Sequence, residues 1–301
     1  LLYMNSLRIR CQLYLYNIIR MELNSADFIQ MDNGIKKYEE KFGNRLYHYT
    51  SLNAFLCMMR TREIWMSSTG SMNDRKEITY FIELLEKELK SYCRQDFFEK
   101  VYNQIPFSYK YAFCLSTEKD DAAQWERYGD SAMGVCLSFN VGELYKCLYG
   151  YNDIMFNEVF YNDSITNDAY FEIVKKYFDK GNIDIYSSEE ELIRQLIYAG
   201  NLHKHKSFKN EHEIRITTMD NKSPYGTEYA LKEIGNVVKK VYILKPDIMG
   251  NSKGTSLEKI IDEVIVGPRS QQNINILRQY IYSNGLYDLA DRITMSECPL
   301  R

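Results

Sequence analysis

The chain has 301 residues, of which 26% are charged and 45% are apolar, so it is long enough for one large domain or two small ones with an ample core. Its net charge of -3 excludes a global basic field that would draw it to nucleic acid. No apolar run reaches the roughly 18 to 20 residues that a membrane span needs, so no membrane partner is expected. The seven cysteines are odd in number and widely spaced, which indicates free thiols in a reducing, cytoplasmic compartment.

The N-terminal stretch differs in character from the rest of the chain. Residues 1–20 contain three arginines and no acidic residue, and they lack the apolar core and small-residue cleavage site of a signal peptide. We expect them to be a leader or an N-terminal extension. No linker rich in proline, glycine or serine divides the remainder, so residues 21–301 are predicted to form a single domain.

Hydrophobic periodicity predicts the elements of the first half of the chain. Apolar residues recur at helical spacing in two stretches, and three short apolar or alternating runs are typical of strands. In chain order we expect a strand at 47–50, a helix from 52 to 59, a short strand at 63–67, a loop at 68–71, a helix from 78 to 89 capped by Asn73 or Asp74, and a buried strand at 111–116.

The second half mixes short strands with helices and lacks regular βαβ spacing. The chain is therefore predicted to have an α+β fold, a single domain with a central mixed or antiparallel sheet flanked by helices. The expected elements are a short helix with Ala123, Trp125 and Tyr128, strands at 134–139 and 157–161, two helices within 165–206 of which the second is capped by Ser187 and Glu190, strands at 211–218, 237–243 and 263–266, and a helix around 274–282.

Polar side chains mark two of these strands. His48 and Thr50 are two residues apart, so both should point to one face of their strand, and the same holds for Glu211 and Glu213. Two carboxylates on one face repel each other unless water, a cation or a positive ligand lies between them. The pattern predicts a pocket for a polar ligand that develops positive charge, with His48 and Glu213 on neighbouring strands and within about 10 Å of each other.

Several standard sites are absent from the sequence. There is no Walker-type loop, no Gly-x-Gly-x-x-Gly after a strand and no Gly-x-Ser-x-Gly elbow. No metal centre is expected, because the histidines at 203, 205 and 212 have no cysteine nearby.

The layout of His48-x-Thr50, a helix and a strand ending at Ser67 resembles the NAD-binding opening of ADP-ribosyltransferases. Ser116-Thr117 and Glu211-x-Glu213 resemble the Ser-Thr and Glu-x-Glu elements of the arginine-specific members. The resemblance implies NAD as substrate, with a catalytic glutamate supporting an oxocarbenium-like transition state. In these terms the catalytic residues are Glu213, Glu211 and Ser116, and the NAD-binding residues are His48, Tyr49, Thr50, Ser67, Trp125, Tyr128 and Arg215.

Residues 45–285 also resemble a large family of uncharacterised bacterial domains that are often found near phage-defence genes. This resemblance implies a defence effector or toxin. Arg75 stands where that family commonly has proline, and Asn210 where it usually has an aromatic residue, which leaves the loop geometry open. The shared landmarks are Tyr47-His48-Tyr49, Trp65-Met66-Ser67, Met72-Asn73-Asp74 with Glu77, Phe113-Cys114-Leu115-Ser116, Gln124-Trp125 with Tyr128, Gly134-Val135-Cys136-Leu137, Lys209 with Glu211-x-Glu213-x-Arg215, and Val264-Ile265-Val266-Gly267-Pro268.

Other interpretations stay open at this point. Trp125 and Tyr128 would face the same way on a helix, and core packing accounts for them as well as stacking on a ligand does. Arg215 could form an ion pair with Glu213. A metal-dependent nuclease could use the four carboxylates Asp74, Glu77, Glu211 and Glu213, and a non-enzymatic sensor of a defence system needs none of them. A transferase would act on a protein, a nucleic acid or water, and a toxin implies an antitoxin or another defence-system partner.

Overall fold

The computed structural model describes residues 25–69, 76–94, 96–107, 110–151, 154–165, 169–180, 188–218, 224–234 and 237–300. The expected leader, the end of the loop at 70–71 and the expected cap at Asn73 and Asp74 lie outside these residues.

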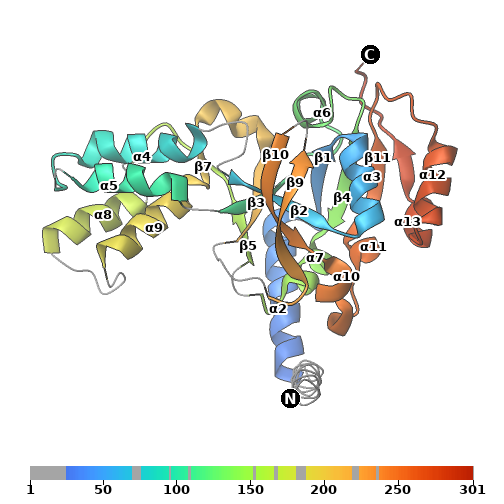
Figure 1. Cartoon of the computed structure of the whole chain (residues 1–301), viewed down its shortest axis with the longest axis horizontal. Helices are drawn as coiled ribbons and strands as arrows, with labels where there is room; N and C mark the ends of the chain where they lie inside the picture. Colours follow the sequence, from blue (N-terminus) through green and yellow to red (C-terminus); the bar gives the residue numbers. More distant parts are fainter. Residues whose placement is uncertain are drawn as a thin grey trace, which may run out of the picture.

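A ten-stranded sheet forms the centre of the described chain (Figure 1). Its strand pairs are antiparallel except for β11 with β12, so the sheet is mixed, as predicted. Along the main path the order is β12 (Ile293–Met295), β11 (Ile261–Val266), β4 (Val135–Asn140), β1 (Arg45–Thr50), β3 (Tyr111–Ser116), β2 (Ile64–Ser68), β10 (Val237–Leu244) and β9 (Thr227–Ile234), with β8 (Glu213–Thr218) and β5 (Ile154–Glu158) branching from β3.

The sheet divides at β3. On one edge, β3 pairs with β8 along its whole length. On the other edge it pairs with β1 only at Ser116 and with β2 only at Tyr111 and Ala112. Within the described chain, the residues between these contacts have no strand partner on that edge. β1 and β2 therefore diverge and leave an opening over the middle of β3.

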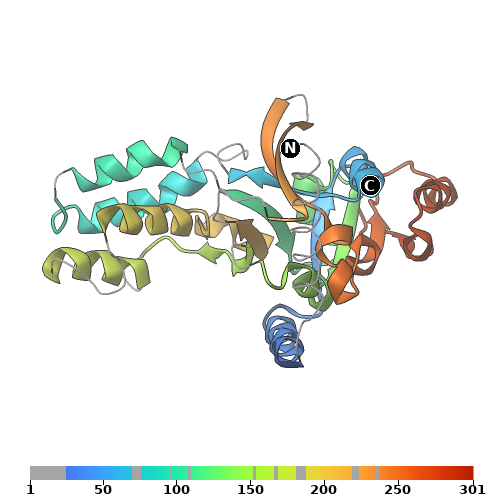
Figure 2. The same ribbon diagram turned by 60° about the horizontal axis from the view of Figure 1, so that its bottom comes forward.

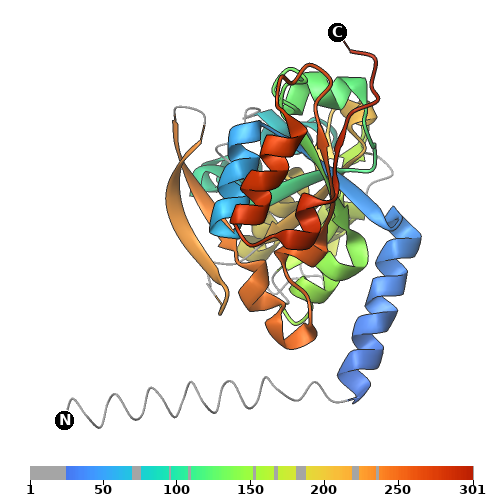
Figure 3. The ribbon, with the colours of Figure 1, turned by 90° about the vertical axis from the view of Figure 1, so that its right-hand side faces the viewer.

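Helices cover the main apolar core on one face of the sheet. α3 (Leu52–Thr61) and α12 (Ile274–Ser283) lie side by side there, as Figure 3 shows. α2 (Ser25–Phe42) packs on α7, where a Cβ on Gly34 would come within 2.5 Å of the Tyr145 ring. The other helices that contribute to this core are α7 (Val141–Leu148), α10 (Pro246–Met249), α11 (Leu257–Ile260) and α13 (Tyr287–Ala290).

A second apolar cluster lies in four helices to one side of the sheet (Figure 2). Two chain segments form it: one connects β2 to β3, and the other connects β6 (Phe160–Tyr161) to β7 (His203–Lys204). The four helices are α4 (Lys76–Leu89), α5 (Phe97–Gln104), α8 (Ala169–Lys180) and α9 (Glu189–Gly200). The described residues therefore form two large apolar cores, with β7 between the four helices and the sheet, and a smaller third cluster around Trp125 on α6 (Ala122–Tyr128).

Most strongly periodic segments form the predicted elements, and three details differ. The strand expected at 157–161 is interrupted at Val159, which separates β5 from β6. The N-cap of α9 is Ser188, whose hydroxyl accepts the Glu191 N–H at 3.2 Å, one residue later than predicted. β8 begins at Glu213, because η3 (Lys206–Glu211) and a left-handed His212, with φ 44°, precede it.

The sequence analysis missed several elements. These are α2, α5, α7, β7, β9, β12 and the short helices α10, α11 and α13. Both faces of β8 are buried. The six described cysteines are free, as predicted. No helix in the described part of the chain is long and apolar enough to cross a membrane.

Candidate functional site

A pocket of about 540 Å³ lies where the sheet divides. β3 contributes its floor, α6 (Ala122–Tyr128) one wall, and the segment from β7 to η3 another. It is lined by Tyr47, His48, Tyr49, Ser67, Cys114, Leu115, Ser116, Gln124, Arg127, Tyr128, Lys204, Phe208, Glu211, Glu213, Arg215 and Lys239. The pocket brings together eight of the ten residues that the sequence analysis selected.

Strand register places the floor residues on one face. Ser116 lies opposite both Tyr47 and Glu213, and Cys114 lies opposite Arg215. Directly paired residues share a face, as do residues two apart on a strand. Glu213 and Arg215 therefore project to the same side, as expected from their spacing.

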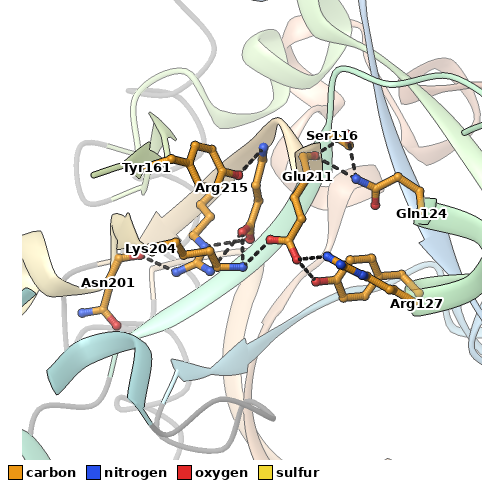
Figure 4. A network of polar contacts seen from close by, with 10 residues as sticks. Ser116, Gln124, Arg127, Tyr161, Asn201, Lys204, Glu211 and Arg215 are labelled. Atoms are coloured by element: carbon orange, nitrogen blue, oxygen red, sulfur yellow. Dashed lines mark hydrogen bonds and ion pairs between the residues drawn. The ribbon is translucent and has the colours of Figure 1, made fainter. Parts of the chain in front are cut away.

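The Glu213 carboxylate is engaged by two cations. Its Oε1 accepts Arg215 Nε–H at 2.7 Å, and its Oε2 lies 2.7 Å from Lys204 Nζ. Arg215 also donates to the Asn201 carbonyl (Figure 4). Burial alone would raise the pKa of Glu213, but the charges of Arg215 and Lys204 override it and lower the pKa to about 2. At neutral pH Glu213 is a carboxylate.

Glu211 is held through both its side chain and its backbone. Tyr128 donates its hydroxyl to Oε1 at 2.6 Å, and Arg127 lies 3.3 Å from the same oxygen. Ser116 Oγ–H and Gln124 Nε2–H donate to the Glu211 carbonyl at 2.7 and 2.8 Å. Ser116 thus acts on the backbone of Glu211 and orders the turn that leads into β8 (Figure 4).

Lys204 resolves the repulsion expected between the two glutamates. Its Nζ lies 2.8 Å from Glu211 Oε2 and 2.7 Å from Glu213 Oε2, and its side chain is only 6% exposed. Of the three possibilities between the carboxylates, which were water, a cation or a positive ligand, the structure has a cation, and it is a side chain of the protein itself. Of the side chains that hold the two glutamates, the sequence analysis selected neither Lys204 nor Arg127, and it named Gln124 only as a family landmark. Lys204 carried no signal, because β7 is two residues long and shows no periodicity.

His48 reaches the pocket from the other face of the sheet. It pairs with Leu137 of the main core, and its ring packs on Phe113 at a centroid distance of 4.4 Å. Its Nδ1–H donates to the Cys114 carbonyl at 2.8 Å, within the opening at β3. Burial lowers its pKa to about 4, so the ring is neutral at neutral pH, with Nε2 as an acceptor.

The expected arrangement of His48 and Glu213 is therefore wrong in two respects. Their strands are not neighbours, since β3 lies between β1 and β8. The alternation along β1 also puts His48 on the face opposite Tyr47, whereas Glu213 shares the face of Tyr47. Both residues line the same pocket only because the sheet is open between β1 and β2.

The remaining selected residues divide into two groups. Tyr49 and Ser67 line the pocket, and the Tyr49 hydroxyl donates to the Glu118 carbonyl at 2.8 Å. Thr50 and Trp125 do not line it. Trp125 is fully buried against Tyr49, whereas Tyr128 is 44% exposed. The expectation that the two side chains face the same way is therefore wrong.

Cys114 does not have the character of a nucleophile. Burial, together with the neighbouring Glu213 carboxylate, raises the pKa of its thiol well above the ordinary value, so the thiol is protonated at neutral pH. Among the described residues, no group of three or more His, Cys, Asp or Glu side chains could hold a metal ion. Asp74 lies outside them, so the carboxylate set of a nuclease is only partly described.

A family model described as "Protein of unknown function (DUF2971)" matches residues 124–216. The matched stretch runs from α6 to β8 and contains the two glutamates of the pocket with Lys204 between them. No curated protein and no solved structure matches the chain. From Gln124 to Ile216 the chain is thus similar to an uncharacterised family, over a shorter stretch than its sequence landmarks suggested.

Proposed function

We propose that the pocket binds NAD and that the protein transfers ADP-ribose from it, releasing nicotinamide. One observation carries the proposal: the open sheet brings His48, Ser116, Tyr128 and both glutamates of the Glu-x-Glu motif to a single pocket. About 540 Å³ lies within the range of small-molecule sites.

The chemistry would place developing positive charge beside Glu213. The bond between the nicotinamide nitrogen and the ribose carbon breaks, and nicotinamide leaves with the electron pair. The ribose carbon then bonds to an acceptor oxygen or nitrogen, which loses a proton. A carboxylate with a pKa of about 2 is a weak base, so the role of Glu213 would be electrostatic stabilisation of the oxocarbenium-like state.

His48 would contribute a neutral acceptor. With Nδ1–H donated to the Cys114 carbonyl, Nε2 is free to accept a ribose hydroxyl. Tyr128, on the wall formed by α6, would lie against the nicotinamide ring while its hydroxyl orients Glu211.

A second candidate is a non-enzymatic binding module. The observation that favours it is the neutralisation of both glutamates by Lys204, Arg215 and Arg127. Such a network suits a structural role, because each buried charge has a partner. In this case the pocket would sense a ligand or a partner of a defence system without turning it over.

Location and partners belong to the same proposal. Free cysteines fit a cytoplasmic effector or toxin of a bacterial antiviral defence system. Its acceptor would be a protein or a nucleic acid, and an antitoxin would restrain it.

Nicotinamide release from NAD, with and without cell lysate, separates the two candidates. We expect release by the wild type, a fall of about 100-fold in Glu213→Gln, and little change in Glu158→Gln, an exposed glutamate at the end of β5. Wild-type protein that releases no nicotinamide even with lysate present would overturn the enzymatic proposal in favour of the binding module.

A further inference from the structure

The pocket carries an excess of positive charge. Among the residues that the structure describes, four basic side chains line it, against two carboxylates. His48 is neutral because its pKa is about 4, and the Cys114 thiol is protonated because its pKa is raised. Two positive charges therefore remain once the carboxylates are balanced. The expectation from Glu211 and Glu213 was a polar ligand that develops positive charge, and the net charge of the pocket adds a preference for negative groups on that ligand.

The excess charge does not lie with the two innermost cations. Lys204 and Arg215 are buried and hold Glu213 directly. Arg127 is half exposed, and among the described residues its ion pair is with Glu211 Oε1, at 3.3 Å, where Tyr128 already donates a shorter hydrogen bond. A carboxylate oxygen shared in this way leaves most of the Arg127 donors available to a ligand.

Lys239 is the other available cation. It lies on β10 directly opposite Lys232 of β9, so two like charges share one face. Lys232 is close to Glu63, at 3.9 Å, and lies over the Trp65 ring. Within the described ranges, Lys239 forms no ion pair. A negative ligand group at Lys239 would relieve the repulsion between the two lysines.

An aromatic surface lies beside these charges. Phe208 lines the pocket, and its ring centroid is 6.0 Å from Arg127 Cζ and 5.8 Å from Lys204 Nζ. Tyr128 lines the pocket from α6. A flat ring can stack on such a surface whatever its hydrogen-bonding pattern.

We infer that the ligand of this pocket is a phosphorylated nucleoside whose phosphate groups bind Arg127 and Lys239 and whose base stacks on Phe208 or Tyr128. The inference deepens the proposed function, since it concerns the same pocket and rests on its being a ligand site. It assigns the phosphate contacts to two residues that no sequence motif selected.

Calorimetric titration of the full chain tests the inference. The probes are adenosine, its 5′-monophosphate, its 5′-diphosphate and inorganic phosphate. We expect the diphosphate to bind at least about tenfold more tightly than adenosine, as for hydrogen bonds to charged groups. Lys239→Gln should weaken binding of the diphosphate about tenfold and leave the affinity for adenosine unchanged. Added salt should likewise weaken binding of the diphosphate and leave that of adenosine unchanged.

Lys240→Gln is the matched control. Lys240 is the next residue on β10, points to the opposite face and lies over the Tyr229 ring, so its replacement should leave all four affinities unchanged. Equal affinities for adenosine and the diphosphate, or equal losses in the two lysine variants, would overturn the inference. So would inorganic phosphate binding as tightly as the diphosphate.

The same samples keep this inference distinct from the proposed chemistry. Phosphate-dependent binding without nicotinamide release from NAD would support the ligand class and reject the transferase. Nicotinamide release that is equal in wild type and Lys239→Gln at subsaturating NAD would support the transferase and reject the phosphate site.

Discussion

At the scale of single residues, replacing Glu213 should destabilise the protein, which the sequence alone did not indicate. Sequence reasoning suggested that neutralising it would relieve repulsion from Glu211, but Lys204 lies between the two carboxylates. Glu213→Gln would leave Arg215 and Lys204 without one buried counter-charge. We expect the free energy of unfolding to fall by about 3 kcal/mol, measured by urea denaturation.

The pH dependence of this effect follows from the pKa of Glu213. The folded-state pKa, about 2, is below the ordinary value of 4.5, so the stabilisation is complete above 4.5 and is lost as the pH falls toward 2. The difference in unfolding free energy between wild type and Glu213→Gln should shrink over that window. A difference that is absent at neutral pH would show that the ion pairs contribute nothing.

His48 should make the stability of the protein depend on pH in a second, higher range. Its folded-state pKa is about 4 against the ordinary 6.5, so the unfolded chain takes up this proton first. Stability from neutral His48 is complete above 6.5 and declines as the pH falls toward 4. In His48→Asn, whose amide can still donate to the Cys114 carbonyl, this part of the decline should disappear. Parallel stability curves for the two proteins between pH 6.5 and 4.5 would contradict the assignment.

At the scale of elements, Asp120 ties α6 to the segment after β12. Its Oδ1 accepts Trp125 Nε1–H at 2.7 Å and the Ser296 hydroxyl at 2.5 Å, and its Oδ2 accepts Glu297 N–H at 2.8 Å. Asp120→Asn replaces an acceptor with a donor. We expect stability to fall by about 1 to 2 kcal/mol, and hydrogen exchange to rise in α6 and in residues 296–300.

Asp130→Asn is the control for this change. Asp130 follows α6 and has φ 56°, close to the 53° of Asp120, so any backbone effect of asparagine is matched. Equal exchange in the two variants would mean that the carboxylate of Asp120 does not hold α6. Because α6 carries Tyr128 and Arg127, the same contact helps to position one wall of the pocket.

At the scale of the whole molecule, the two large apolar cores are built from different elements, one from four helices and the other from the sheet and the helices that cover it. Leu196 is fully buried in the helical core and Leu137 in the core beneath the sheet. Truncating either to alanine should cost about 2 to 5 kcal/mol. If the four helices open as a unit of their own, Leu196→Ala will speed hydrogen exchange in these helices and leave β1 and β4 protected. Leu137→Ala will instead speed exchange both in the four helices and in β1 and β4. Identical exchange maps would mean that the two cores unfold together.

The sequence by itself determined the elements with strong periodicity. The helix of Ile78 to Leu89 and the strand at 111–116 form as predicted, because spacing on one segment reports which side chains share a face. The shared face of Glu213 and Arg215 follows from the same rule. Elements without clear caps or alternation, such as α2 and β9, were missed because their segments lack such a spacing.

Only the tertiary structure decided what those faces meet. Periodicity does not say that Lys204 would lie between two glutamates, or that Trp125 would be buried while Tyr128 reaches Glu211. These contacts depend on the pairing of β3 with β8 and on the divergence of β1 from β2. Such pairings join residues on the order of a hundred positions apart in the chain, and they are selected by the packing of the whole molecule rather than by local propensity. The polar residues of the motifs were therefore visible in the sequence, but the charge balance of the pocket they line was not.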